Sequence, residues 1–449
     1  MSDIRTEHDM LGPVSVPAAA LYGAQTARAA VNFGTTSSRL SDRPELLRAL
    51  GQVKASAAEA NRELGVLEPA IAAVIVRAAE ELAAGGLREH FPIALVQGGG
   101  GTSTNMAVNE VLANRAAQLL GAEPGRSDVV HPLDHVNRSQ SSNDVVPTAL
   151  SLAVHACAPA ALAGLGAVTA ALDGLAARAG DGLRLGRTCL QDAVPLPIAA
   201  YHGAQATAVR RASAALRRSI EPLLEVPLGA TAVGTGLGAP PGYRGRAVTL
   251  LALRSGLALR PAVDPFDALA HLDPLLRVAS EAAVASLTLA KIAADIRLLS
   301  SGPVGGIGEV RIPAVQVGSS QMPGKVNPVI PELVLQASFE IRGSAHVVEL
   351  AAAAGELDLN VMEMVVARHL LAALVQLGEV SSLFALRCLE GLEWEREVVD
   401  RHLEGSRAAA VERALESGHD AQRGDSRVDR AGTTSDTIAT SAEEAHDGG

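Results

Sequence analysis

The chain has 449 residues, a formal net charge of −11 and only 2% aromatic residues. This length exceeds what one compact hydrophobic core usually supports, so we expect more than one domain. The negative charge, with no cluster of basic residues, argues against a nucleic-acid-binding protein. The alanine- and leucine-rich, aromatic-poor composition favours an all-α fold.

Several features of the sequence indicate the cellular compartment of the protein. The three cysteines, Cys157, Cys189 and Cys388, are an odd number and lack the spacing of metal ligands. The N-terminal MSDIRTEHDM shows no charged segment followed by an apolar one. The apolar stretch 151–177 contains His155 and Asp173, so we interpret it as a buried bundle helix and not as a membrane span. We expect a cytoplasmic protein without membrane or nucleic-acid partners.

Apolar periodicity predicts long helices along the chain. They cover about 146–179, 199–225, 272–300 and 329–354, with a further, broken helical stretch over 358–390. The clearest begins with Leu-Asp-Pro, and its apolar residues recur in steps of three and four: Leu275, Val278, Ala282, Ala285, Leu289, Ile292, Ile296 and Leu299. A helix of about thirty residues spans about 45 Å. These helices predict an elongated bundle whose small alanine faces allow helices or subunits to approach closely.

Polar, glycine-rich loops separate the predicted helices. They are QGGGGTSTN at 97–105, SQSSND at 139–144, GRTCLQD at 186–192 and the long segment 300–328. Loops on a rigid helical scaffold are where catalytic residues usually lie, and a loop as long as the last is typical of a lid or a binding loop. The tail from about 419 has few sizeable apolar residues, so we predict that it is disordered.

Three of these loops have the composition of an anion-binding site. In GSSQMPGKVNP (318–328), a glycine and two serines favour a nest of backbone N–H groups, and Lys325 and Asn327 add a cation and an amide. Thr102 follows four glycines, and Ser141, Ser142 and Asn143 open a helix. Each loop alone is more typical of an ordinary turn or cap. Together they predict a small dicarboxylate substrate.

Other ligand classes have weaker support. The nucleotide-binding pattern GxxxxGK[ST] is absent. His131 and His135 are four residues apart, but Pro132 and the lack of a glutamate between them disrupt the zinc-protease pattern. We expect no metal and no cofactor.

The motifs also resemble those of a known family. GSSQMPGKVNP is similar to the GSSxMPxKxNP signature of the aspartase/fumarase superfamily. QGGGGTSTNMAVNEVLANRA, HPLDHVNRSQSSNDVVPTA, GRTCLQDAVPL and LGATAVGTGL resemble its other sequence blocks in the same order. Three further phrases, VNPVIPELVLQ, LTLAKIAADIRLLSSGP and AGELDLNVMEMV, resemble aspartate ammonia-lyases more than fumarate hydratases. The resemblance covers about residues 5–400.

The resemblance implies a long-helix homotetramer with a shared multi-helix core and active sites built from loops of three subunits. It implies domains at 1–143 (N-terminal, helical), 144–396 (the central bundle) and 397–449 (a shortened C-terminal region). Ser319 would be the general base, and Lys325 and Asn327 would bind a substrate carboxylate. The remaining substrate-binding residues would be Thr102, Ser141, Ser142, Asn143 and Thr188. The loop Gly302–Ser320 would close over the ligand.

The sequence departs from the family pattern at several positions. The family usually has a histidine after Gly-Arg-Thr, and in hydratases this histidine would act with the glutamate at the position of Glu332. In this sequence the histidine is replaced by Cys189. Residue type alone favours packing of this thiol over reactivity. Gly238, Val304 and Gln321 also replace the family's usual residues.

The resemblance leaves the reaction open between related alternatives. The first is a lyase that eliminates ammonia from L-aspartate to give fumarate. The others are a fumarate hydratase, a lyase acting on another substituted succinate, and a non-catalytic tetrameric binding protein.

Overall fold

The computed structural model describes residues 4–34 and 38–406, so the predicted disordered tail lies outside the described residues. The chain divides into two compact units. The first contains the described residues up to Gly180 together with Ala199–Trp394. The second contains Asp181–Ile198 and the described residues from Glu395 onward. The domain boundaries at 143 and 396 stay a prediction.

The first unit is mainly helical, as the composition predicts. Its helices are α1 (Ala24–Phe33), α2 (Pro44–Glu63), α3 (Pro69–Ala83), α4 (Thr102–Leu119), α5 (Ser142–Ala179), α6 (Ile198–Ile220, whose first residue belongs to the second unit), α7 (Tyr243–Ser255), α8 (Pro265–Ala270), α9 (Asp273–Leu299), α10 (Val329–Ala352) and α11 (Glu363–Phe384). A π-helical turn at Ala385–Leu389 continues α11, which agrees with the predicted broken helix.

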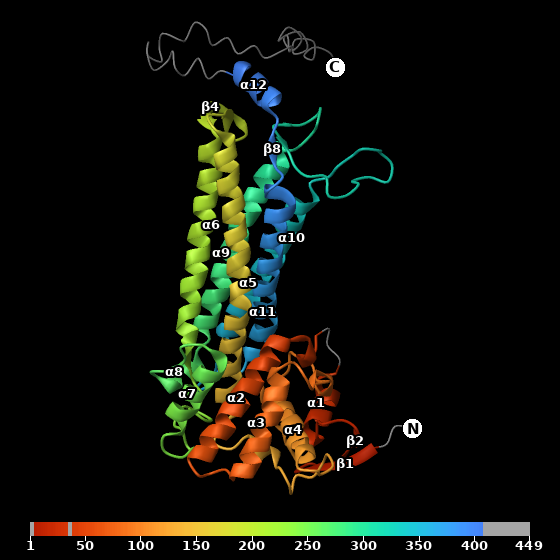
Figure 1. Ribbon diagram of the computed structural model, residues 1–449, viewed down its shortest axis with the longest axis vertical. Helices are drawn as coiled ribbons and strands as arrows, with labels where there is room; N and C mark the ends of the chain where they lie inside the picture. The colour runs from red at the N-terminus through yellow and green to blue at the C-terminus, as the bar shows by residue number, and fades with distance from the viewer. Residues whose placement is uncertain (1–3, 35–37, 407–449) are drawn as a thin grey trace, which may run out of the picture. The chain divides into compact units, whose positions relative to one another are not determined.

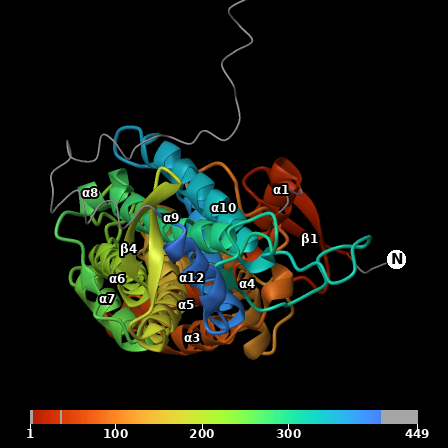
Figure 2. The ribbon, with the colours of Figure 1, turned by 90° about the horizontal axis from the view of Figure 1, so that it is seen from above.

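The long helices α5, α6, α9, α10 and α11 lie side by side in a bundle (Figures 1 and 2). All eight apolar residues of the stripe predicted for α9 are buried. Helices α5 and α11 approach closely through facing glycines: a Cβ added at Gly164 would lie 2.7 Å from the Gly378 carbonyl oxygen. The small faces seen in the sequence therefore allow tight helix packing.

Two helical segments, Ser142–Ala179 and Glu363–Leu389, have the length and apolar composition of a membrane span. In their most apolar windows, 72% and 56% of the residues are buried inside the protein. The first contains the stretch 151–177, which is part of the bundle core as predicted.

Short two-stranded sheets were not predicted from the sequence. In the first unit, β1 (Ile4–Asp9) pairs antiparallel with β2 (Gly12–Pro17), β5 (Glu225–Val226) parallel with β6 (Arg260–Pro261), and β7 (Val310–Arg311) antiparallel with β8 (Glu393–Trp394). In the second unit, β3 (Leu183–Thr188) and β4 (Gln191–Pro197) form a hairpin, and α12 (Arg396–Glu404) packs on β3. The segment GRTCLQD, expected to be a connection, is thus the turn of a hairpin.

Candidate active site

Ser319 lies in the loop that joins α9 to α10, and its hydroxyl oxygen faces backbone donors. The Ser319 Oγ accepts hydrogen bonds from the N–H of Gln321 at 3.1 Å and of Met322 at 3.0 Å. Two N–H dipoles directed at one oxygen stabilise negative charge on it, which a serine needs in order to act as a base. These donors differ from the ones that the sequence suggested, because they belong to Gln321 and Met322, while the Gly318 N–H donates to the Lys325 carbonyl.

Lys325 and Asn327 follow in a turn that closes on Gly318. The Gly318 N–H donates to the Lys325 carbonyl at 2.8 Å, and the Asn327 Nδ2 donates to the Gly318 carbonyl at 2.8 Å. A Cβ at position 318 would lie 2.8 Å from the Asn327 nitrogen and the Lys325 oxygen, so the turn requires glycine. The Lys325 side chain is exposed, and no residue within 4–34 or 38–406 pairs with its ammonium. This cation is free to meet an anion.

A second group of predicted residues surrounds the first turns of α4 and α5. Thr102 is the exposed first residue of α4. Ser141 is the N-cap of α5, and its hydroxyl accepts the Asn143 N–H at 3.2 Å. Asn143 also donates through Nδ2 to the Ala232 carbonyl at 2.7 Å. Asn105 of α4 donates to the Ser142 Oγ at 3.0 Å, which joins the two helix starts.

A buried lysine that the sequence reasoning missed lies beneath this second group. The Lys54 Nζ, on α2, donates to Asn137 Oδ1 and to Gln140 Oε1, each at 3.0 Å. Asn137 Oδ1 also accepts a hydrogen bond from Asn105 Nδ2 at 3.1 Å. Burial lowers the pKa of Lys54 to about 7, while the charge of Asp144 acts in the opposite direction.

A sequence signal for Lys54 exists. The residue stands four positions after Leu50, on the same helical face as this buried leucine. A lysine on an apolar helical face needs buried partners.

Asp144 fixes the start of α5 to the loop 228–237. Its Oδ1 accepts the Ser141 N–H at 3.0 Å, and its Oδ2 accepts the N–H of Gly229 at 3.0 Å and of Thr231 at 2.8 Å. Burial raises the pKa of Asp144 to about 7, and the three N–H donors and Lys54 act against that shift. The carboxylate thus holds two sequence blocks of the candidate site together.

Cys189 is exposed at the apex of the β3–β4 hairpin in the second unit. Thr188, also exposed, pairs with Gln191, which leaves Cys189 and Leu190 as a two-residue loop. Their φ angles are 52° and 60°, the left-handed conformation of a type I′ turn. The expectation that the thiol packs in a core is wrong for this chain, because a turn apex has no core to fill.

Glu332 lies in the first turn of α10 and pairs with a cation of its own unit. The Arg297 Nε donates to Glu332 Oε1 at 3.3 Å. Within its own unit, Glu332 is thus paired with an arginine. Cys189, its predicted partner, belongs to the second unit.

Within the first unit, the two groups of predicted residues lie far apart. The loop between α9 and α10 is at one end of the bundle, while α4 and the start of α5 are at the other (Figure 1). Helix α5 has 38 residues, which corresponds to about 57 Å at 1.5 Å per residue. One copy of the chain does not bring Ser319 to Thr102 or Ser142.

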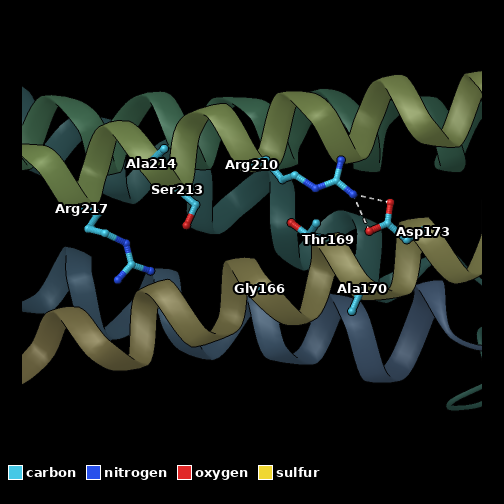
Figure 3. Close-up of a pocket in the computed structure, with 8 residues that line it drawn as sticks. All are labelled: Gly166, Thr169, Ala170, Asp173, Arg210, Ser213, Ala214 and Arg217. Atoms are coloured by element: carbon cyan, nitrogen blue, oxygen red, sulfur yellow. Dashed lines mark hydrogen bonds and ion pairs between the residues drawn. The ribbon is translucent and has the colours of Figure 1, made fainter.

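A groove of about 380 Å³ lies between α5 and α6, and none of the predicted site residues lines it (Figure 3). Its lining includes Arg210, which donates to the Asp173 Oδ1 at 2.6 Å, and Arg217. Both residues of the Arg210–Asp173 pair are about half exposed. An exposed pair of this kind stabilises a fold only weakly and does not mark a catalytic centre.

The two histidines with metal-like spacing form local hydrogen bonds. The His131 Nδ1 accepts the N–H of Leu133 and of Asp134 at 3.3 and 3.0 Å, and the His135 Nδ1 accepts the His131 N–H at 2.9 Å. Both rings thus cap the π-helical turn Pro132–Val136. Over the described residues, no group of three or more His, Cys, Asp or Glu side chains has the arrangement of a metal site.

Comparison with known proteins supports the family expected from the motifs. A family model described as a lyase matches residues 12–343. The chain belongs to the aspartase/fumarase superfamily. It is 41% identical over 406 residues to a class II fumarate hydratase from Thermosynechococcus vestitus, covering 90% of this chain and 86% of that protein.

Relatives with the other activity are equally similar. The chain is 42% identical over 392 residues to an aspartate ammonia-lyase from Pseudomonas canavaninivorans, covering 87% of this chain and 83% of that protein. An aspartate ammonia-lyase from Escherichia coli is 38% identical over 406 residues, with 90% and 85% covered. The superfamily member is thus a lyase, and overall identity does not choose between the two reactions.

Solved structures have the same fold. The chain superimposes on a fumarate lyase:delta crystallin from Brucella melitensis with a TM-score of 0.90 and 38% identity, covering 93% of this chain and 91% of that one. A class II fumarase from Schistosoma mansoni gives a TM-score of 0.90 at 32% identity, with the same coverage. The elongated long-helix fold expected from the sequence is confirmed.

Proposed function

We propose that this lyase eliminates ammonia from L-aspartate to give fumarate, with Ser319 as the base. The observation that carries the proposal is the pair of N–H groups that donate to the Ser319 Oγ. They support an alkoxide that removes a proton from the carbon next to a substrate carboxylate. The exposed Lys325 ammonium and the Asn327 amide are the donors for the aci-carboxylate that forms when the proton leaves.

The proposed elimination then breaks the carbon–nitrogen bond. The electron pair of the aci-carboxylate forms the double bond of fumarate, and the nitrogen leaves as neutral ammonia because the amino group already carries its proton. Thr102, Ser141, Ser142, Asn143 and Thr188 are proposed to bind the rest of the dicarboxylate, and the loop 302–320 to close over it. This chemistry assigns no step to a metal or cofactor.

The active site is proposed to form between copies of the chain in a homotetramer. Its support is that the loop between α9 and α10, which contains Ser319, and the start of α5, which contains Ser142, lie at opposite ends of one bundle (Figure 1). The bundle helices also carry large apolar side chains that are exposed in a single copy: Val284, Leu287, Leu298, Leu333, Phe339, Leu350 and Leu383. A tetramer would bury such residues in its shared helical core.

The choice of ammonia over water as leaving group rests on Cys189. A departing hydroxide needs a proton from an acid, whereas an ammonium group does not. A thiol, with a reference pKa of about 8.5, is mostly neutral near pH 7 and is a weak hydrogen-bond donor. Within one copy of the chain, Glu332, the predicted partner of this position, pairs with Arg297. The alternative is fumarate hydration, which the similarity to a class II fumarate hydratase favours.

Addition to fumarate separates the two reactions. The purified protein is incubated with fumarate in water, and in parallel with fumarate plus ammonium or other amine or anionic nucleophiles. We expect the double-bond absorbance to fall much faster with ammonium than in water alone. Rapid formation of malate without an amine would overturn the ammonia-lyase proposal and put the hydratase first.

The cytoplasm is the proposed compartment. Cys157, Cys189 and Cys388 are all free thiols. Reduced cysteines are typical of cytosolic proteins.

A further inference from the structure

The buried lysine beneath the start of α5 has no role in the proposed chemistry, although burying its amine is costly. Lys54 is 0% exposed. Its two hydrogen-bond acceptors, Asn137 Oδ1 and Gln140 Oε1, are both amide oxygens, and neither carries a charge to compensate an ammonium. A fold keeps such a group only where its partners make up for the cost of desolvation.

The donors and acceptors around Lys54 form a directed chain. An ammonium group can only donate to these amides, so Asn137 must turn its oxygen toward protonated Lys54. That oxygen also faces Asn105 at 3.1 Å, so Asn105 must present its NH₂ group and not its own oxygen. The second hydrogen of the same NH₂ group goes to the Ser142 Oγ at 3.0 Å.

The chain of hydrogen bonds ends at the Ser142 hydroxyl. Because its oxygen already accepts from Asn105, its hydrogen is directed elsewhere and is available to a ligand. The Ser142 side chain is partly exposed. Burial lowers the pKa of Lys54 to about 7, and the protonated amine fixes the direction of the hydrogen bonds, because only the ammonium form has no acceptor.

We propose that Lys54 is a positioning residue for dicarboxylate binding, which acts through Asn137 and Asn105 to keep the Ser142 hydroxyl as a donor to a substrate carboxylate. This inference rests on the proposed binding role of Ser142. Without Lys54, the Asn137 amide keeps its hydrogen bond with Asn105 and a longer one from its Nδ2 to the Gln140 carbonyl at 3.3 Å. It loses the cation that requires its oxygen to face inward. If the amide rotates, Asn105 can present its oxygen, and Ser142 then donates to Asn105 instead of to the ligand.

A double-mutant cycle read by equilibrium binding of fumarate tests this. In the wild-type background, Ser142→Ala should raise the Kd for fumarate about tenfold or more, since a hydrogen bond to a charged group is lost. In the Lys54→Met background the same change should raise the Kd less than about twofold. Asn137→Leu interrupts the same series of hydrogen bonds at the next residue. If the Lys54→Met protein does not fold, the Asn137→Leu background should reduce the effect of Ser142→Ala on the Kd in the same way.

Asn61→Ala is the matched control. Asn61 lies on the same helix and holds the same loop, because its Nδ2 donates to the Arg138 carbonyl and its Oδ1 accepts from Ser139, but it is outside the chain of donors. In this background, Ser142→Ala should keep its full effect.

Three outcomes would count against the inference. A full tenfold effect of Ser142→Ala in folded Lys54→Met or Asn137→Leu protein would overturn the role of Lys54 but leave the proposed function intact. Loss of the Ser142 effect in the Asn61→Ala control would also overturn that role, because general loosening of the loop would then suffice. Wild-type protein that binds neither fumarate nor succinate would overturn the proposed function as well.

Discussion

Replacing Asp144 by asparagine should destabilise the start of α5 by a large amount. The carboxylate accepts three backbone N–H bonds, two of them at Oδ2, whereas an asparagine has one oxygen. If that oxygen keeps Gly229 and Thr231, the amide nitrogen faces the Ser141 N–H. One donor then loses its acceptor, at about 1–3 kcal/mol. The neutral amide avoids the cost of burying a charge, which offsets the weaker bonds to Gly229 and Thr231. We expect a loss of about 1–3 kcal/mol.

The assay is urea unfolding combined with hydrogen–deuterium exchange of peptides that contain 141–145 and 228–232. Asp144→Asn should lower the unfolding midpoint and raise deuterium uptake in both peptides. Asp173→Asn is the control on the same helix, because its side chain is 48% exposed and such pairs contribute less than about 1 kcal/mol. A midpoint and an uptake equal to those of the control would refute the reasoning about the three N–H bonds.

Three further changes test single residues. Ser319→Ala should keep the fold but lower kcat by about 10²–10⁴-fold, because proton abstraction loses its base; near-normal turnover would remove Ser319 from the mechanism. Cys189→His should raise malate formation from fumarate, and Cys189→Ser should leave the amine reaction within about tenfold; steady-state assays that show neither would separate residue 189 from the chemistry. Burial lowers the pKa of His155, so below about pH 6.5 the unfolded chain binds a proton that the folded chain does not, and stability falls on acidification. His155→Leu should make the urea midpoint less sensitive to acid, and an unchanged pH profile would argue against this.

The long helices were predictable because burial imposes a repeat of three and four residues on any helix that packs in a bundle. The stretch predicted as 272–300 is α9 at Asp273–Leu299, and its whole apolar stripe is buried. The hairpin 183–197 was not predictable in this way. Its turn residues are Cys189 and Leu190, which adopt positive φ without the glycine or asparagine that usually marks such a turn.

The individual loops of the candidate site were predictable from residue types, but their placement was not. Sequence order does not reveal that the α9–α10 loop with Ser319 and the start of α5 with Ser142 lie at opposite ends of a bundle (Figure 1), because this depends on the direction in which each long helix runs. The network around Lys54 joins residues 83 and 86 positions apart through side-chain hydrogen bonds. Such contacts leave no local periodicity, and only the unusual lysine on an apolar face indicates them.

The central claim is tested most directly by the reaction in the elimination direction. The purified protein is given L-aspartate or L-malate at equal concentrations, and fumarate is measured by its absorbance and identified by NMR. The account predicts that kcat/KM for L-aspartate exceeds that for L-malate by at least about 100-fold, a difference of about 2.7 kcal/mol in transition-state binding. Fumarate formation from L-malate with none from L-aspartate would contradict it.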